Sequence, residues 1–232
     1  MTDGPAAQTR AARSTLAANV HRQLKADIIA CRALPGAMLA ASQLAERFQV
    51  SQSPVHEALK TLCREGFLRV LPRVGYIVTP VSGSDVDEIF DLRLSLEVFG
   101  AGQAAQRVTD QDLARLREQH ARALQNVGRG SLDDPAHLES VMAGNRQFHT
   151  MIATLSGNHR LSGIVGGLLD EGQRIYFLYC RPGRSIQAQD PHEDIVRALA
   201  SRDPGAARAA MAAHIEAQRR GTHLDFPSDQ PV

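Results

Sequence analysis

Residues 44–66 read LAERFQVSQSPVHEALKTLCREG and contain two helical patterns separated by a short break. In the second pattern apolar residues recur at intervals of three and four, which indicates a helix with one buried face. These residues are Val55, Ala58, Leu59 and Leu62. Pro54 falls in the first turn, where its missing N–H is tolerated. A shorter helix, with Ser42 as its expected N-cap, ends before Gln49-Val50-Ser51. The two patterns predict a helix-turn-helix.

The segments on either side extend this unit. Helical spacing continues through Val20, Leu24, Ile28 and Cys31 until Leu34-Pro35-Gly36 forces a turn. After Gly66 the pattern becomes that of two strands, which flank Pro72-Arg73-Val74-Gly75. Three helices and a two-stranded hairpin predict a winged helix-turn-helix at residues 16–82, preceded by a loose tail at residues 1–15.

The rest of the chain has no strand pattern and is mainly α-helical. Helices are expected at 84–107, 109–127, 134–156, 158–180, 186–201 and 204–221. Six helices predict an all-α bundle that forms a second domain over residues 83–225.

The formal net charge of +1 is the sum of two unequal parts. Residues 1–82 carry 10 basic and 5 acidic side chains, whereas residues 83–232 carry 16 and 20. This difference excludes a uniform polycation and indicates two domains with different partners. No stretch approaches the roughly 18 apolar residues of a membrane span, and no signal-peptide pattern is expected. The odd, scattered cysteines Cys31, Cys63 and Cys180 favour free thiols in the cytoplasm.

One face of the second helix of the helix-turn-helix is polar and suits the major groove of DNA. Gln can pair with adenine, and Lys or Arg with guanine or phosphate. The hairpin adds cations that would lie beside the DNA backbone. The candidate DNA-binding residues are Ser51, Gln52, Ser53, His56, Lys60, Arg64, Arg69, Arg73 and Gly75. The competing interpretation is a solvated helix face.

Three histidines of the second domain lie on apolar helix faces. Asn145 and His149 are one turn apart and share such a face. His192 and His214 are each 11 residues from Asp203, so a turn at Asp203 would bring both to the same height on antiparallel helices. Three imidazoles and one side-chain oxygen can form a metal site, with Zn²⁺ or Ni²⁺ the best fit. The competing interpretation is a set of hydrogen-bonded core histidines, which would also fit His120.

From Val20 to Val81 the chain resembles the GntR-type winged-helix regulators. The matching segments are Leu34-Pro35-Gly36, Leu44-Ala45, the run from Val50 to Leu59, Glu65-Gly66 and the Gly75 wing. Family members usually carry Arg where this chain has Gln52 and His56. The resemblance therefore implies a divergent operator, with more of the phosphate affinity coming from the other cations.

Residues 84–222 resemble the FCD ligand-binding domain of the FadR branch of that family. The motifs are Asp91-Leu92-Arg93-Leu94-Ser95-Leu96-Glu97, Asn145-x-x-Phe148-His149, Gly157-Asn158, His192-x-x-Ile195 and Ala210-Met211-x-x-His214. The resemblance implies a divalent metal at Asn145, His149, His192 and His214, and Arg93 as a clamp for a carboxylate effector. Asn158, Arg174 and Tyr176 are further candidates for the effector pocket. For Arg93 the alternative is an ion pair with Glu97 one turn along the helix.

These observations predict a homodimeric transcription regulator, expected to be a repressor, that binds an inverted-repeat operator and responds to a small organic acid. Protein two-fold symmetry would mirror the symmetry of the operator. One alternative is a metal sensor, in which the metal itself is the effector. A remote alternative is a His-metal hydrolase, but no catalytic residue is assigned because no carboxylate base accompanies the histidines.

Overall fold

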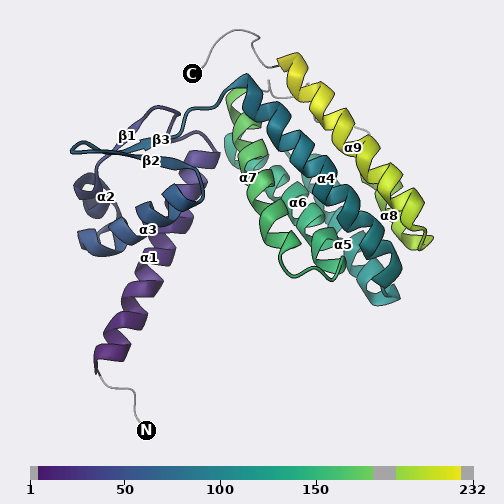
Figure 1. Cartoon of the computed structure of the whole chain (residues 1–232), viewed down its shortest axis with the longest axis horizontal. Coiled ribbons are helices and arrows are strands. Elements are labelled where there is room, and N and C mark those ends of the chain that lie inside the picture. Colours follow the sequence, from purple (N-terminus) through teal and green to yellow (C-terminus); the bar gives the residue numbers. More distant parts are fainter. Residues whose placement is uncertain (1–4, 180–191, 226–232) are drawn as a thin grey trace. The chain divides into compact units, whose positions relative to one another are not determined.

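The computed structural model of the protein describes residues 5–179 and 192–225 (Figure 1). The chain divides into two compact units; the first ends at Val81 and the second begins at Ser82. The sequence analysis places the boundary one residue later, between residues 82 and 83. Among the described helices, none combines the length and apolar character needed to cross a membrane.

The first unit is a winged helix-turn-helix, as predicted. Its elements are α1 (Pro5–Ile29), β1 (Met38–Leu39), α2 (Ala41–Phe48), α3 (Gln52–Arg64), β2 (Leu68–Leu71) and β3 (Gly75–Val78). The strands form an antiparallel sheet in the order β1-β3-β2. The strand β1 is absent from the sequence prediction because its two residues are too few to show an alternating pattern.

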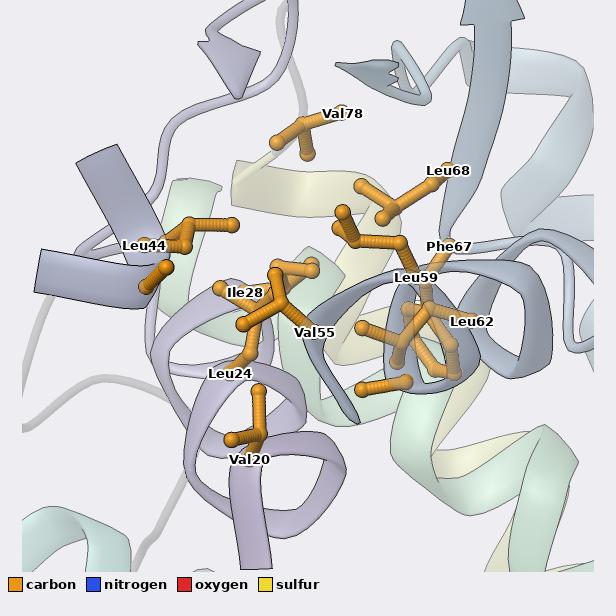
Figure 2. Close-up of a cluster of buried hydrophobic side chains, with 12 residues drawn as sticks. Val20, Leu24, Ile28, Leu44, Val55, Leu59, Leu62, Phe67, Leu68 and Val78 are labelled. Carbon is orange, nitrogen blue, oxygen red and sulfur yellow. The ribbon is translucent and has the colours of Figure 1, made fainter. Parts of the chain in front are cut away.

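The core of this unit lies where α1 and α3 pack together beneath the sheet (Figure 2). The apolar stripe that defines α3 in the sequence is buried, with Val55, Leu59 and Leu62 fully inaccessible. Val20, Leu24 and Ile28 of α1 face it, while Phe67, Leu68 and Val78 close the cluster from the sheet side. Burial of one face of α3 leaves its opposite face available to solvent.

Two details of this unit differ from the sequence prediction. The residues from 5 to 15, expected to be a loose tail, are part of α1, because this Ala-rich segment contains good helix formers. The N-cap of α2 is Ala40 rather than Ser42, since Ser42 already lies inside the helix. Residues 1–4 lie outside the described part of the chain.

The second unit contains the six expected helices in its described part. They are α4 (Gly83–Arg107), α5 (Asp110–Val127), α6 (Pro135–Leu155), α7 (Leu161–Tyr179), α8 (Glu193–Ala200) and α9 (Pro204–Asp225). The long α4 packs against α6, α7 and α9, so it forms the centre of the bundle. The start predicted for α8, at residue 186, and Cys180 lie outside the described residues; α8 begins at Glu193.

Capping residues fix where the first two helices of the bundle begin. The backbone N–H and hydroxyl of Ser82 donate to Asp85, and those of Thr109 donate to Asp112. The Thr109 hydroxyl in turn accepts from the Asp112 backbone N–H. Each pair is a capping box, which satisfies backbone groups that a helix start leaves unpaired. The hydrogen bonds from Thr109 also lower the pKa of Asp112.

Candidate functional site

The exposed face of α3 carries the candidate base-reading side chains. Gln52, His56, Lys60 and Arg64 are exposed, and Ser53 is half-buried. The helix is entered from Ser51, whose extended backbone forms its N-cap. The His56 ring lies 6.4 Å from the Tyr76 ring, so the N-terminal half of α3 is near β3 of the wing. The structure thus gathers these residues on one surface of the first unit.

The wing presents Arg73 at the turn between β2 and β3. Arg73 is exposed and has a φ of 67°, the left-handed conformation of a tight turn. Gly75 follows with a φ of 138°, and a Cβ atom there would lie 3.1 Å from the Leu39 carbonyl oxygen of β1. Gly75 is therefore required by the approach of two strands. Arg69 is exposed on β2.

Part of the positive charge of this unit is occupied by structural ion pairs. The buried Asp27 accepts from Arg32 at 2.8 Å and from Arg47 at 2.5 Å. Glu65 pairs with His21 and Lys25. These four cations are balanced within the unit and are therefore less available to phosphate than the exposed cations of α3 and the wing.

Three histidines from different parts of the second unit converge in its core. His149 lies on α6, His192 is the N-cap of α8, and His214 lies on α9. One ring nitrogen from each lies within 4.8 Å of the others, and all three side chains are buried. The turn at Asp203 brings His192 and His214 together as their equal spacing predicts, with ring centroids 4.8 Å apart. Asn145 is half-buried one turn before His149.

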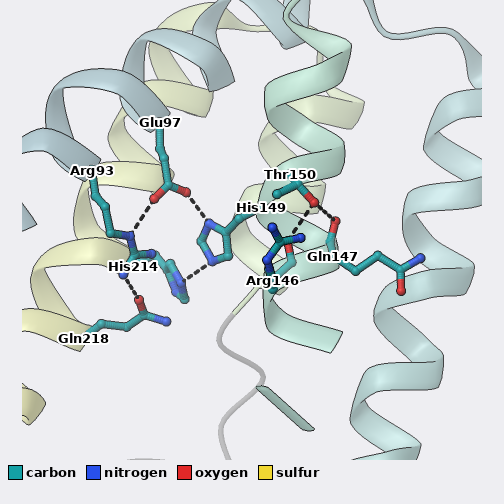
Figure 3. Close-up of polar contacts among 8 residues, drawn as sticks. All are labelled: Arg93, Glu97, Arg146, Gln147, His149, Thr150, His214 and Gln218. Atoms are coloured by element: carbon teal, nitrogen blue, oxygen red, sulfur yellow. Dashed lines mark hydrogen bonds and ion pairs between the residues drawn. The ribbon is translucent and has the colours of Figure 1, made fainter. Parts of the chain in front are cut away.

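A buried carboxylate orients His149 (Figure 3). Nδ1 of His149 lies 2.5 Å from Oε2 of Glu97, and Nε of Arg93 donates to Oε1 of Glu97 at 2.7 Å. Burial raises the pKa of Glu97, but the charges of His149 and Arg93 and their hydrogen bonds outweigh it and lower the pKa to about 2. Because Glu97 is ionised, it can only accept, so Nδ1 of His149 donates to it and Nε2 is the ring nitrogen that faces His214.

The histidine geometry fits a divalent metal. Nε2 of His149 lies 3.2 Å from Nε2 of His214, close to the separation of about 3.3 Å between two imidazole ligands of a tetrahedral zinc ion. Burial, followed by the charges of neighbouring groups, lowers the pKa of His192 well below its usual range. A neutral imidazole is the form that binds a metal. A hydrogen bond between His149 and His214 is the competing explanation of the 3.2 Å contact.

Glu97 and His120 are neighbours of this centre that sequence spacing does not assign to it. The sequence analysis predicts only one contact for Glu97, the ion pair with Arg93. The structure shows that pair and adds the contact with His149. His120 of α5 lies edge-on to His192 at 5.6 Å, and Phe148 stacks on His192 at 4.0 Å. The signal for Glu97 in the sequence is its position, with Arg93, among the apolar residues of one face of α4.

Arg93 forms the ion pair with Glu97 that the sequence analysis gave as the alternative to an effector clamp. Its Nε binds Glu97 and its Nη1 donates to Gln218 of α9 at 2.9 Å (Figure 3). Its Nη2 is buried and has no hydrogen-bond partner among the described residues. A buried guanidinium nitrogen with unused donors is suited to a carboxylate ligand.

The other effector-pocket candidates have different environments. Asn158 is exposed, and its side-chain oxygen accepts from the Arg160 backbone N–H, so it stabilises the turn that precedes α7. Arg174 and Tyr176 are buried on α7. Tyr176 packs with Leu138 of α6 in a separate apolar cluster.

Comparison with protein families yields two matches that follow the two units. Residues 16–78 match the family described as bacterial regulatory proteins, gntR family, and residues 88–217 match the FCD domain. The repressor RspR of Escherichia coli K12 is 26% identical over 200 residues, or 85% of this chain and 84% of RspR. McbR of the same organism is 28% identical over 201 residues, or 85% and 88%. YdhC of Bacillus subtilis is 28% identical but aligns over 62% of each chain.

Solved structures of regulators share this fold. That of E. coli McbR/YncC superimposes with a TM-score of 0.76 at 26% identity and covers 91% of this chain and 99% of its own. A putative GntR regulator from Rhodococcus sp. RHA1 has a TM-score of 0.71 at 20% identity over 91% and 99% of the two chains. These relatives are transcription regulators and not enzymes.

Proposed function

Because the chain belongs to the GntR family of bacterial transcription regulators, in the branch with a C-terminal FCD domain, we propose that it is a homodimeric repressor released from DNA by a small carboxylate. The observation that carries this proposal is the buried His149–His192–His214 cluster beside Arg93. The name of the relative RspR, a transcriptional repressor, supports the sign of the regulation. The protein acts in the cytoplasm, where its operator DNA lies.

In this proposal α3 enters the major groove and the wing contacts the DNA backbone. The exposed Gln52 and Lys60 read base edges, while Arg69 and Arg73 neutralise phosphates. Two copies related by a two-fold axis would contact two half-sites of an inverted repeat.

The FCD domain holds a divalent cation, Zn²⁺ or Ni²⁺, with His149, His192, His214 and Asn145 as the ligands. When bound, the metal supplies positive charge and a coordination position for an anionic oxygen. Glu97 orients His149 from behind, as a carboxylate does in many histidine–metal sites. Asn145 is a neutral ligand, so it leaves more of the metal charge available to an anion.

Arg93 provides the second attachment point for the effector. Its Nη2 donates to the carboxylate, while its bonds to Glu97 and Gln218 hold the guanidinium in place. Arg93 joins α4 to α9 through its hydrogen bond to Gln218. A ligand bound at Nη2 would therefore alter the contact between these two helices. The effector shifts DNA affinity only by its preference for one arrangement of the protein over another.

The test of this function combines DNA binding with ligand release. A duplex selected from random DNA by the protein should bind with an affinity that falls steeply as salt rises. A panel of small mono- and dicarboxylates should contain a compound that weakens binding by the zinc-loaded protein and has no effect on Arg93→Lys. Failure to retard any duplex at low salt would contradict the proposal.

A metal sensor is the second candidate function, and it uses the same three histidines. In a sensor, addition of metal alone to metal-free protein changes operator affinity several-fold without an organic acid. If the metal is a fixed component, only the carboxylate changes the affinity. A titration of each separates the two candidates. The hydrolase alternative has no support among the relatives, which are regulators.

A further inference from the structure

The first unit contains a groove between α1, α3 and β2. Its volume is about 780 Å³, which lies within the range of about 300–1,000 Å³ typical of small-molecule pockets. Because α1 continues past α3 toward the N-terminus (Figure 1), one side of α1 is left uncovered there. The walls include Ser14, Ala17, Ala18, Lys60, Arg64 and Val70, and we refer to this site as the α1/α3 groove.

Small and apolar side chains form much of the lining. Ala17 and Ala58 are buried and Cys63 is half-buried. Burial raises the pKa of the Cys63 thiol, as an apolar environment does. Val70 is 61% exposed although its side chain is branched and apolar. An apolar body placed in the groove would remove this surface from water, which favours binding.

The charged side chains of the groove leave a surplus of positive charge. Lys60 is exposed and forms no ion pair with the described residues. Arg64 donates from Nη2 to Thr61 at 2.9 Å and has no acidic partner in the described part of the chain. Glu57 is the one acidic residue among the described residues that line the groove. The groove therefore favours a ligand that carries negative charge.

We propose that the α1/α3 groove is a second ligand site, which binds a small organic anion with an apolar body. The apolar body covers Val70 and the alanines of α1, while the anionic group pairs with Lys60 and Arg64. These two cations also belong to the proposed DNA-binding face, so the ligand and the DNA phosphates compete for them. The competition rests on the proposed function, whereas binding of the anion does not.

The first test uses 8-anilinonaphthalene-1-sulfonate, an apolar ring system with one sulfonate, as a fluorescent probe of the intact, metal-free chain. Ala18→Glu should weaken its binding at a saturable site by about tenfold or more, because a carboxylate in the wall repels the sulfonate. The matched control is Ala26→Glu, since Ala26 is also exposed on α1 but lies outside the groove. Circular dichroism checks that both variants are folded. Equal probe affinity of wild type and folded Ala18→Glu would overturn the site.

The second test asks whether charge contributes to binding. Naphthalene-1-sulfonate should displace the probe from wild type at a concentration about tenfold lower than naphthalene-1-sulfonamide, which has a similar shape but no charge. The displacement is measured on the part of the fluorescence that Ala18→Glu loses. Equal displacement by the two compounds would contradict an anion as the ligand.

The third test measures competition with DNA by electrophoretic mobility shift. The probe should release a selected duplex from wild type and Ala26→Glu at a concentration about tenfold lower than from Ala18→Glu. His149→Ala should respond like wild type, because the histidine centre belongs to the second unit. A probe that saturates the groove without weakening DNA binding would overturn the competition. If no duplex is retarded at all, the proposed function fails, while the probe titration still decides whether the site exists.

Discussion

His149 is held from both sides of its ring. Glu97 fixes the proton on Nδ1, and Nε2 is thereby presented to His214 and His192. Burying the carboxylate of Glu97 together with Arg93 costs desolvation free energy. A role in ligand binding would account for keeping such a pair in the core. The ordering of these groups therefore supports a ligand site in preference to a chance cluster of core histidines.

His149→Ala should abolish stoichiometric metal binding while the fold remains, since loss of one ligand does not remove a helix. Elemental analysis of protein equilibrated with zinc and then desalted measures the metal content. His159→Ala is the matched control, because His159 is exposed. Unchanged zinc stoichiometry in His149→Ala would remove this residue from the site.

Glu97→Gln should lower zinc affinity by about 10- to 100-fold, as is typical when the partner of a metal-binding histidine is changed. The amide can still accept a hydrogen bond from His149 but does not offer a negative charge. Competition with a chromophoric chelator measures the affinity. An unaltered affinity in folded Glu97→Gln would mean that Glu97 serves only Arg93.

Sequence spacing predicts which histidines meet in the core, but it does not predict the residues that hydrogen-bond to them. Equal distances from Asp203 predict the approach of His192 to His214. The contact between Glu97 and His149 joins residues of α4 and α6, and no periodicity of a single helix encodes it. Asn158 shows the reverse case, because a motif residue expected in the pocket is exposed and stabilises the turn before α7.

At the scale of single elements, the wing turn combines strain and charge. Arg73 occupies a left-handed conformation that a residue with a Cβ atom adopts at a cost. An exposed cation beside the strands of the wing is suited to a contact with a DNA phosphate. Replacement by glycine removes the charge and leaves the turn conformation accessible.

Arg73→Gly should weaken binding to specific and nonspecific duplexes to a similar degree and should reduce the salt slope by about one unit. Fluorescence anisotropy over a range of salt concentrations measures both quantities. Arg202→Gly is the matched control, since Arg202 also has a positive φ but lies between α8 and α9. A loss confined to one operator sequence would mean that Arg73 reads a base.

Thr109→Ala should reduce the free energy of unfolding of the second unit by about 1 kcal/mol, because the capping box at the start of α5 is lost. Thr109→Ser retains the hydroxyl and should lose less stability. Chemical denaturation followed by circular dichroism compares the three proteins. Equal midpoints and slopes for all three would show that the cap contributes nothing.

Sequence patterns predict the long helices well and the short elements poorly. The apolar periodicity over Val55 to Leu62 defines α3 and its exposed face, and breakers such as Asp203-Pro204-Gly205 separate the later helices. Only pairing with β3 makes Met38 and Leu39 a strand. The early start of α1 follows from helix propensity alone, since residues 5–15 lack a strong apolar stripe.

The whole molecule separates its charges by function. The cations proposed to meet phosphate are exposed on α3 and the wing of the first unit, whereas Arg93, proposed to meet an effector, is buried in the second unit. The net charge of +1 is therefore a cancellation between two domains with different partners.

The most direct test of the metal-centre claim is anomalous X-ray diffraction, at the zinc edge, from crystals of the full chain equilibrated with zinc. We expect one strong peak per chain, at about 2.0–2.1 Å from a ring nitrogen of each of His149, His192 and His214. A zinc-equilibrated crystal with no anomalous peak there, and with His149 and His214 in direct hydrogen bond, would contradict it.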